Sequence, residues 1–237
     1  MASLFTDRAI SYRYDKKFSQ FGVLLSVTVQ KMVRSDKGAS GVMFSIDTES
    51  GFQDAVLVNA VYGLGEYIVQ GYVTPDEYYV YSKTMDQGFE PIVGKTLGSK
   101  ERKLIYGKGG RDTLGVAVSG TDRSRFVLTD KEVLQLARWA MIVERHYKKP
   151  MDMEWAKDGI TGKLFIVQAR PETVKSRMDV TSLQTYILEQ KGKLLLQGAS
   201  VGEKIAAGRV SLIKDVKQIK KFKAGDILVT KMTDPDW

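Results

Sequence analysis

Two short alternating runs around a polar turn, within residues 150–174, constrain the fold of this chain more than any other stretch. Polar and apolar side chains alternate on both sides of the turn at residues 158–162. Side chains two apart on a strand point to the same face. The pattern therefore predicts a β-hairpin with one polar and one apolar face. We expect the polar face to carry Asp152, Glu154, Gln168 and Arg170, and the core face to carry Met153, Trp155, Phe165 and Val167.

The polar face of this hairpin has two explanations, which spacing alone supports equally. In the first, Glu154 and the amide oxygen of Gln168 bind a magnesium ion, which needs hard oxygen ligands and usually shares them with substrate phosphates. Arg170 then offers a bidentate fork to phosphate. In the second, the four side chains form a cross-strand ladder that contributes little to stability if it is exposed.

The rest of the chain predicts a mixture of helices and short strands. The clearest helix follows the capping box from Thr129 to Glu132. Residues 107–125 are too rich in Gly, Ser and Asp to assign. The predicted helices are Leu4–Phe18, Gly63–Gly71, Thr129–Tyr147 and Asp215–Phe222. The predicted strands are Val23–Val33, Gly41–Ile46, Ala55–Ala60, Glu77–Ser82, Ile92–Thr96, Lys103–Tyr106, Tyr186–Leu188, Lys193–Leu196, Arg209–Ile213 and Asp226–Thr230, besides the hairpin.

Composition narrows the classes of function. The chain has 237 residues, no cysteine and a formal net charge of +8 at pH 7. The lack of cysteine excludes disulfide and thiolate chemistry and fits a cytoplasmic protein. The lysines are spread out without recurring aromatic neighbours, which favours a solvated exterior over a nucleic-acid surface. No apolar run approaches the roughly 20 residues of a membrane span, so we expect neither a nucleic-acid nor a membrane partner.

Three other candidate motifs fail on spacing or context. Gly88–Thr96 has five residues between its glycines, whereas a phosphate-binding loop has four. The dinucleotide fingerprint that begins at Gly63 has Ile68 in place of its third glycine. His146, which is the only histidine, falls near the end of a predicted helix, where a solvated side chain favoured by the helix dipole is far more common than a nucleophile.

Seven segments closely resemble the phosphoenolpyruvate synthase (pyruvate, water dikinase) family, in order and over essentially the whole chain. They are S-L-F-T-D-R-A-I-S-Y-R (3–13), V-Q-K-M-V-R-S-D (29–36), S-G-V-M-F-S-I-D-T-E-S-G-F (40–52), G-L-G-E-Y-I-V-Q-G (63–71), P-M-D-M-E-W-A-K-D-G (150–159), F-I-V-Q-A-R-P-E-T-V (165–174) and G-D-I-L-V-T-K-M-T-D-P-D-W (225–237).

The resemblance implies an α+β fold in two parts. Residues 1–178 correspond to the C-terminal part of an ATP-grasp nucleotide-binding domain. Residues 179–237 correspond to the beginning of a β/α swivelling phosphohistidine domain, with the polar segment Lys175–Val180 as the boundary. The first helix has no capping preamble and the second part has no closing element. We therefore expect the sequence to be a segment of a longer unit.

The resemblance also implies which residues form the site. Glu154 and Gln168 correspond to the Mg²⁺-binding pair, Arg170 to the phosphate-binding arginine, and Asp152 to its acidic neighbour. Glu66 corresponds to an acid that contacts the ribose hydroxyls of ATP. The residues that correspond to the adenine pocket are Gln30, Met32 and Val33. Charge neutralisation and positioning are what phosphoryl transfer requires from a protein.

For the whole enzyme, the resemblance implies gluconeogenic conversion of ATP, pyruvate and water to AMP, phosphoenolpyruvate and phosphate, with a homo-oligomer as one form of the full-length protein. The phosphocarrier histidine of the family follows a G-G-R-T-x-H stretch that this sequence does not contain. The resemblance also implies an earlier half of the ATP-grasp domain, with a basic phosphate-contacting motif of the type V-R-S-S, that this sequence does not supply. We therefore expect the chain alone to be inactive and not to bind ATP tightly. Two alternatives remain: a related dikinase-type phosphotransferase, such as an antibiotic-phosphorylating one, and a non-catalytic binding or assembly module of the same fold.

Overall fold

The computed structural model describes residues 2–85, 87, 89–109, 112–172, 193, 195, 205–230 and 233. The chain divides into two compact units, Met1–Val33 and Arg34–Trp237. The predicted domain boundary at residues 178/179 lies outside the described residues, as do the predicted strand Tyr186–Leu188 and most of Lys193–Leu196. In the described part of the chain, no helix has both the length and the apolar content to cross a lipid bilayer.

The first unit contains the 3-10 helix η1 (Ala2–Phe5) and helix α1 (Asp7–Asp15). The Thr6 hydroxyl caps α1 by accepting a hydrogen bond from the Ala9 N–H. The predicted helix ended at Phe18, but α1 ends earlier because Lys17 adopts a positive φ of 57°.

The predicted strand Val23–Val33 is wrong, because these residues form irregular chain. Leu24 and Val29 are 90% and 95% exposed. The β-branched composition of this segment favours a strand only where a neighbouring strand can form the backbone hydrogen bonds. Among the described residues, no strand pairs with this segment.

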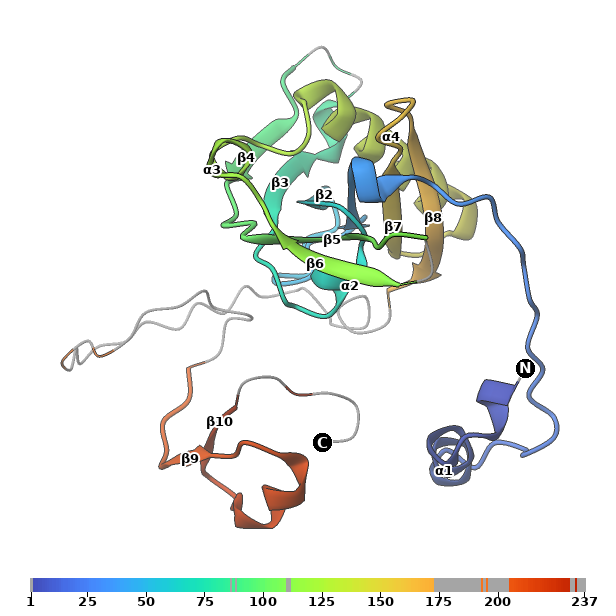
Figure 1. Ribbon diagram of the computed structural model, residues 1–237, viewed down its shortest axis with the longest axis vertical. Helices are drawn as coiled ribbons and strands as arrows, with labels where there is room; N and C mark the ends of the chain where they lie inside the picture. Colours follow the sequence, from blue (N-terminus) through green and yellow to red (C-terminus); the bar gives the residue numbers. More distant parts are fainter. Residues whose placement is uncertain are drawn as a thin grey trace. The chain divides into compact units, whose positions relative to one another are not determined.

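The second unit is organised around a six-stranded sheet in the order β4-β3-β2-β1-β7-β8 (Figure 1). Every neighbouring pair is antiparallel. The strands β1 to β4 lie within two residues of their predicted bounds at either end, and β7 and β8 lie on the two sides of the predicted turn at residues 158–162. The strands are β1 (Ala39–Phe44), β2 (Ala55–Tyr62), β3 (Asp76–Tyr81), β4 (Ile92–Thr96), β7 (Met151–Lys157) and β8 (Leu164–Pro171).

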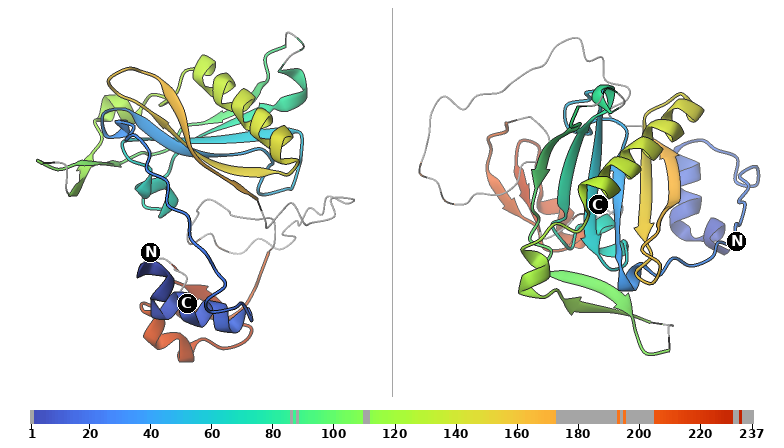
Figure 2. Two further views of the ribbon diagram at one scale, coloured as in Figure 1. Left: turned by 90° about the vertical axis from the view of Figure 1, so that its right-hand side faces the viewer. Right: turned by 90° about the horizontal axis from the view of Figure 1, so that it is seen from above.

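Helix α4 (Asp130–Tyr147) covers one face of this sheet (Figure 2). The predicted capping box is confirmed, since the Thr129 hydroxyl accepts from the Glu132 N–H and the Glu132 carboxylate accepts from the Thr129 N–H. The apolar stripe of α4 packs on the inward side chains of the strands. This core includes Met43, Val58, Tyr78, Val80, Val133, Leu136, Ala137, Ala140, Met151, Met153 and Trp155.

The second unit also contains smaller elements. The hairpin of β5 (Arg102–Tyr106) and β6 (Thr113–Ala117), followed by helix α3 (Gly120–Arg123), occupies much of the stretch that the sequence left unassigned. Three short helices are η2 (Ser35–Lys37), α2 (Glu66–Val69) and η3 (Ser82–Thr84). Farther along the chain, β9 (Val210–Leu212) and β10 (Ile227–Val229) pair in parallel around the 3-10 helix η5 (Val216–Lys221).

A buried ion pair ties β3 to the segments that flank it. Asp76 and Lys100 are both fully buried and form a salt bridge. The same Asp76 carboxylate accepts hydrogen bonds from the backbone N–H groups of Gly98, at 2.9 Å, and Val127, at 2.8 Å. One side chain therefore joins three segments that are distant in the sequence.

The core face of the β7–β8 hairpin differs from the prediction at two residues. A β-bulge interrupts the register, because Glu154 pairs with Gln168 while Trp155 pairs with Ile166. Val167 is therefore the extra residue of β8. Between the turn and Val167, the side chains of β8 that point into the core are therefore Leu164 and Ile166. Phe165, predicted to be buried, lies opposite Ala156 and is 40% exposed.

Asp158 stabilises the turn of this hairpin, and we expect the contribution to depend on pH. Its carboxylate accepts hydrogen bonds from the N–H groups of Thr161 and Ile160, both at 2.8 Å, and of Arg34, at 3.2 Å. These bonds lower the pKa of Asp158 from 3.8 to about 2. The stabilisation is therefore present above pH 3.8 and is lost as the pH falls through 2.

The variant Asp158→Asn tests this expectation, because its amide oxygen can accept the bonds from Ile160 and Thr161 without titrating, although the bond from Arg34 to the other oxygen is lost. The difference in urea midpoint between the wild-type chain and the variant should shrink as the pH falls from 5 to 2. A difference that stays constant over that range would show that ionisation of Asp158 does not contribute.

Candidate functional site

The strand register brings the four predicted polar residues of the hairpin together on one face of the sheet. Asp152 lies directly opposite Arg170, and Glu154 lies directly opposite Gln168. Directly paired residues of antiparallel strands project to the same side. The bulge follows Glu154 and leaves both pairs intact, so the polar face was predicted correctly although the apolar face was not. Helix α4 packs on the apolar face, which leaves the polar face uncovered by that helix.

The first pair is an ion pair. The Nε and NH2 atoms of Arg170 lie 2.8 Å and 2.7 Å from one carboxylate oxygen of Asp152. The Asp152 side chain is only 14% exposed, whereas that of Arg170 is 68% exposed. Asp152 therefore holds the Arg170 guanidinium in place, while the outward side of this guanidinium remains accessible. For Asp152 and Arg170, the structure therefore confirms the cross-strand ion pair that the second explanation predicts.

The second pair does not fit the ladder explanation. Among the described residues, the side chains of Glu154 and Gln168 form no hydrogen bond or ion pair, although they face each other on paired strands. A carboxylate and an amide oxygen are ligands that Mg²⁺ accepts. In the part of the chain that the structure describes, no cluster of three or more His, Cys, Asp or Glu side chains is placed to hold a metal ion. A metal ion held by Glu154 and Gln168 would therefore need its remaining ligands from substrate or water.

Glu66 is placed near this face by the glycine-rich loop that precedes α2. The Ser40 hydroxyl donates a 2.7 Å hydrogen bond to the carbonyl of Gly63. Ser40 lies opposite Ala156, so it shares the face of Glu154. Gly63 has a φ of 82°, and a Cβ there would lie 2.4 Å from the Leu104 carbonyl oxygen, so the loop requires glycine. The exposed Glu66 begins α2 directly after this loop.

The other predicted site residues are less constrained by the structure. Gln30, Met32 and Val33 lie in irregular chain of the first unit, so their role in an adenine pocket remains a prediction. His146 is exposed in the last turn of α4, with its ring against the edge of Tyr147 at 4.9 Å. This position confirms the prediction that His146 is a solvated surface residue.

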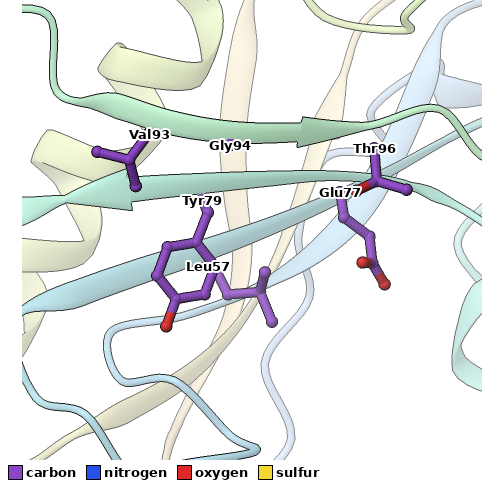
Figure 3. Close-up of a pocket in the computed structure, with 6 residues that line it drawn as sticks. All are labelled: Leu57, Glu77, Tyr79, Val93, Gly94 and Thr96. Carbon is purple, nitrogen blue, oxygen red and sulfur yellow. The ribbon is translucent and has the colours of Figure 1, made fainter. Parts of the chain in front are cut away.

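The same face of the sheet carries polar residues that the sequence did not single out. One cross-strand row runs from Asp152 through Phe44, Leu57 and Tyr79 to Gly94. With strands about 4.8 Å apart, this row places β3 about 14 Å from β7. A pocket of about 310 Å³ lies at the β3–β4 end (Figure 3). It is lined by Leu57, Glu77, Tyr79, Val93, Gly94 and Thr96.

Two residues that line this pocket have shifted pKa values, and an unsatisfied polar group lies next to one of them. Burial, together with the charge of Glu49, raises the pKa of Glu77. Burial and a hydrogen bond to Asp47 raise the pKa of Tyr79. The Oδ1 atom of Asn59, opposite Glu77, is buried without a hydrogen-bond partner among the described residues. The alternation within the predicted strands placed Glu77 and Tyr79 on one face, but only the strand order shows that this face is also that of Glu154.

The chain is similar to known proteins over its whole length. Residues 1–190 match the family described as "Pyruvate phosphate dikinase, AMP/ATP-binding domain". The whole chain is 54% identical to the phosphoenolpyruvate synthase of Synechocystis sp. and 54% identical to that of Pseudomonas aeruginosa. It is 50% identical to the phosphoenolpyruvate synthase of Escherichia coli. In each case the chain spans only 30% of the length of the relative.

Proposed function

This chain belongs to the pyruvate phosphate dikinase AMP/ATP-binding domain family, and from that premise we propose that the polar face of β7 and β8 is one wall of a Mg·ATP site. Glu154 and Gln168 hold the metal, and Arg170, fixed by Asp152, holds a phosphate. Glu66 contacts the ribose, and Gln30, Met32 and Val33 line the adenine pocket. In fold terms, residues 1–178 are the C-terminal part of an ATP-grasp domain, and residues 179–237 begin a swivelling phosphohistidine domain.

The observation that carries the proposal is the absence of any partner for Glu154 and Gln168 among the described residues. Glu154 is half-buried and Gln168 is exposed, so both side-chain oxygens face each other with no protein group in the described part of the chain competing for them, and a hard cation can use them as ligands. The adjacent Asp152–Arg170 pair supports it, because a carboxylate that orients a guanidinium prepares it for bidentate contact with phosphate. When bound, Mg²⁺ would neutralise charge on the phosphates of ATP.

We further propose that the chain contributes this site to phosphoenolpyruvate synthesis in the cytoplasm. The relatives named above are phosphoenolpyruvate synthases that are similar to this chain over its whole length, which supports this reaction. The overall conversion takes ATP, pyruvate and water to AMP, phosphoenolpyruvate and phosphate. Phosphoryl transfer relies mainly on positioning and charge neutralisation, which a metal pair and an oriented arginine provide.

Binding of Mn·ATP tests the site, since Mn²⁺ is a paramagnetic substitute for Mg²⁺. We expect NMR signals of β7 and β8 near Glu154 and Gln168 to broaden selectively when up to 5 mM Mn·ATP is added to the chain. The affinity should be weak, with a dissociation constant on the order of 1 mM. Glu154→Gln removes a charged ligand and should weaken binding at least about tenfold, which is about 1.4 kcal/mol.

Glu90→Gln is the matched control, because it removes the same charge from an exposed residue outside the sheet. It should bind Mn·ATP as the wild-type chain does. If the wild-type chain shows no selective broadening of β7 and β8, or if both variants lose it equally, then Glu154 and Gln168 do not form the metal site.

A further inference from the structure

A second pocket, of about 370 Å³, lies beside α4 and is unrelated to the polar face of β7 and β8. Helix α4 lines it with Arg138, Met141, Ile142 and Arg145. These residues are spaced i, i+3, i+4 and i+7, so they form one stripe along two turns of the helix. The helix lies on the opposite face of the sheet from Glu154, because its own apolar stripe packs on the core side.

The opposite wall of this pocket comes from the segments that flank β2 and β3. Asp54, Ser82 and Lys83 face the stripe of α4. Lys83 and Asp54 form an ion pair of 2.5 Å, so the charges of this wall neutralise each other. The wall adds hydrogen-bonding groups to the pocket without cancelling the charge of the arginines.

The two arginines leave the pocket positively charged. Neither Arg138 nor Arg145 has a carboxylate within 4.0 Å anywhere in the described part of the chain. The Nε atom of Arg145 donates to the Met141 carbonyl at 3.2 Å, which holds its guanidinium over the stripe. Unpaired guanidinium groups at the edge of a cavity favour phosphate and carboxylate ligands.

The floor between the arginines is apolar. Ile142 is 56% exposed, and Met141 is half-buried. Seven residues of α-helix rise about 10 Å, so the backbone positions of the two arginines lie about two turns apart, with Met141 and Ile142 between them. Methionine adapts its shape to flat apolar ligands. The pocket thus combines one apolar surface with cationic ends.

We propose that this pocket binds a small organic phosphate monoester with a flat apolar or aromatic body. The phosphate contacts Arg138 or Arg145, and the body packs on Met141 and Ile142. The site is separate from the Mg·ATP wall and does not depend on the metal pair.

Titration with 1-naphthyl phosphate, monitored by NMR shifts of α4 and by calorimetry, tests the proposal on the full chain. We expect saturation with a submillimolar dissociation constant, at least about tenfold tighter than inorganic phosphate or 1-naphthol. The double variant Arg138→Gln/Arg145→Gln should weaken binding at least about tenfold. The double variant Lys148→Gln/Lys149→Gln removes the same charge from exposed residues just beyond α4 and should change binding less than twofold.

Several results would overturn the assignment. Failure of the wild-type chain to saturate at 10 mM 1-naphthyl phosphate rules out the site. Equal affinity for inorganic phosphate shows attraction by charge alone, and equal affinity for 1-naphthol shows an apolar contact alone. Equal losses in the two double variants show that net charge, and not the pocket, governs binding. Loss of binding in Arg170→Gln locates the probe on the polar face of β7 and β8 instead.

Discussion

Replacement of Lys100 by methionine should lower the free energy of unfolding of the Arg34–Trp237 unit by about 3–5 kcal/mol. Lys100 and its partner Asp76 are completely buried. A buried carboxylate that loses its cation retains a desolvation cost that its two remaining hydrogen bonds, from Gly98 and Val127, only partly offset. The loss therefore reflects the charge left unpaired on Asp76 rather than the strength of the original contact.

Urea unfolding followed by far-UV circular dichroism measures this loss. Lys95→Met provides the control, since it breaks the exposed pair with Asp130 and should cost no more than about 1 kcal/mol. The double variant Asp76→Asn/Lys100→Met removes both charges and should be more stable than the sum of the two single losses predicts. Equal effects of Lys100→Met and Lys95→Met would mean that burial does not determine the cost of losing Asp76's partner.

Truncation of Trp155 to alanine should cost about 3–5 kcal/mol, because it empties the largest fully buried side-chain position in the described residues. Trp155 lies opposite Gly41 on β1 and opposite Ile166 on β8. A Cβ at Gly41 would lie 2.8 Å from the Trp155 ring, so the indole occupies the space that glycine leaves. The cavity in the alanine variant would therefore extend across the centre of the sheet.

Phenylalanine at the same position separates packing from hydrogen bonding. The Trp155 Nε1 atom is buried without a partner among the described residues, so Trp155→Phe removes an unsatisfied group together with part of the ring. It should cost clearly less than alanine, by about 2 kcal/mol or more in chemical denaturation. Similar losses for the two variants would indicate that the indole N–H is bonded in solution.

The sequence located most of the sheet, because its signals are local. The capping box at Thr129 and the alternation around Asp158 each depend on neighbours a few residues away. The same reasoning placed Glu154 beside Gln168, since the turn between them fixed the pairing. Local propensity failed over Val23–Val33, where the composition favours a strand but no described strand supplies its hydrogen bonds.

Features that depend on distant contacts could not be predicted. The bulge at Val167 moves Phe165 out of the core. The alternation of polar and apolar residues cannot reveal a single extra residue in a strand. The link between Asp76 and Lys100 requires the path of the chain between them. The raised pKa of Glu77 comes from burial and the charge of Glu49, and the Asn59 oxygen is left unpaired by burial, so both depend on how the rest of the chain packs around them.

Among the strands that the structure describes, the two outermost of the six-stranded sheet, β8 and β4, share a feature that bears on self-association. The β8 strand carries the bulge at Val167, and the pairing of β4 with β3 shifts between Tyr79 and Val80. A straight outer strand exposes a regular row of backbone donors and acceptors onto which a second molecule can extend the sheet. A bulge breaks that row and twists the strand. Both rims of this sheet are therefore poor templates for intermolecular pairing, which protects a large antiparallel sheet against aggregation.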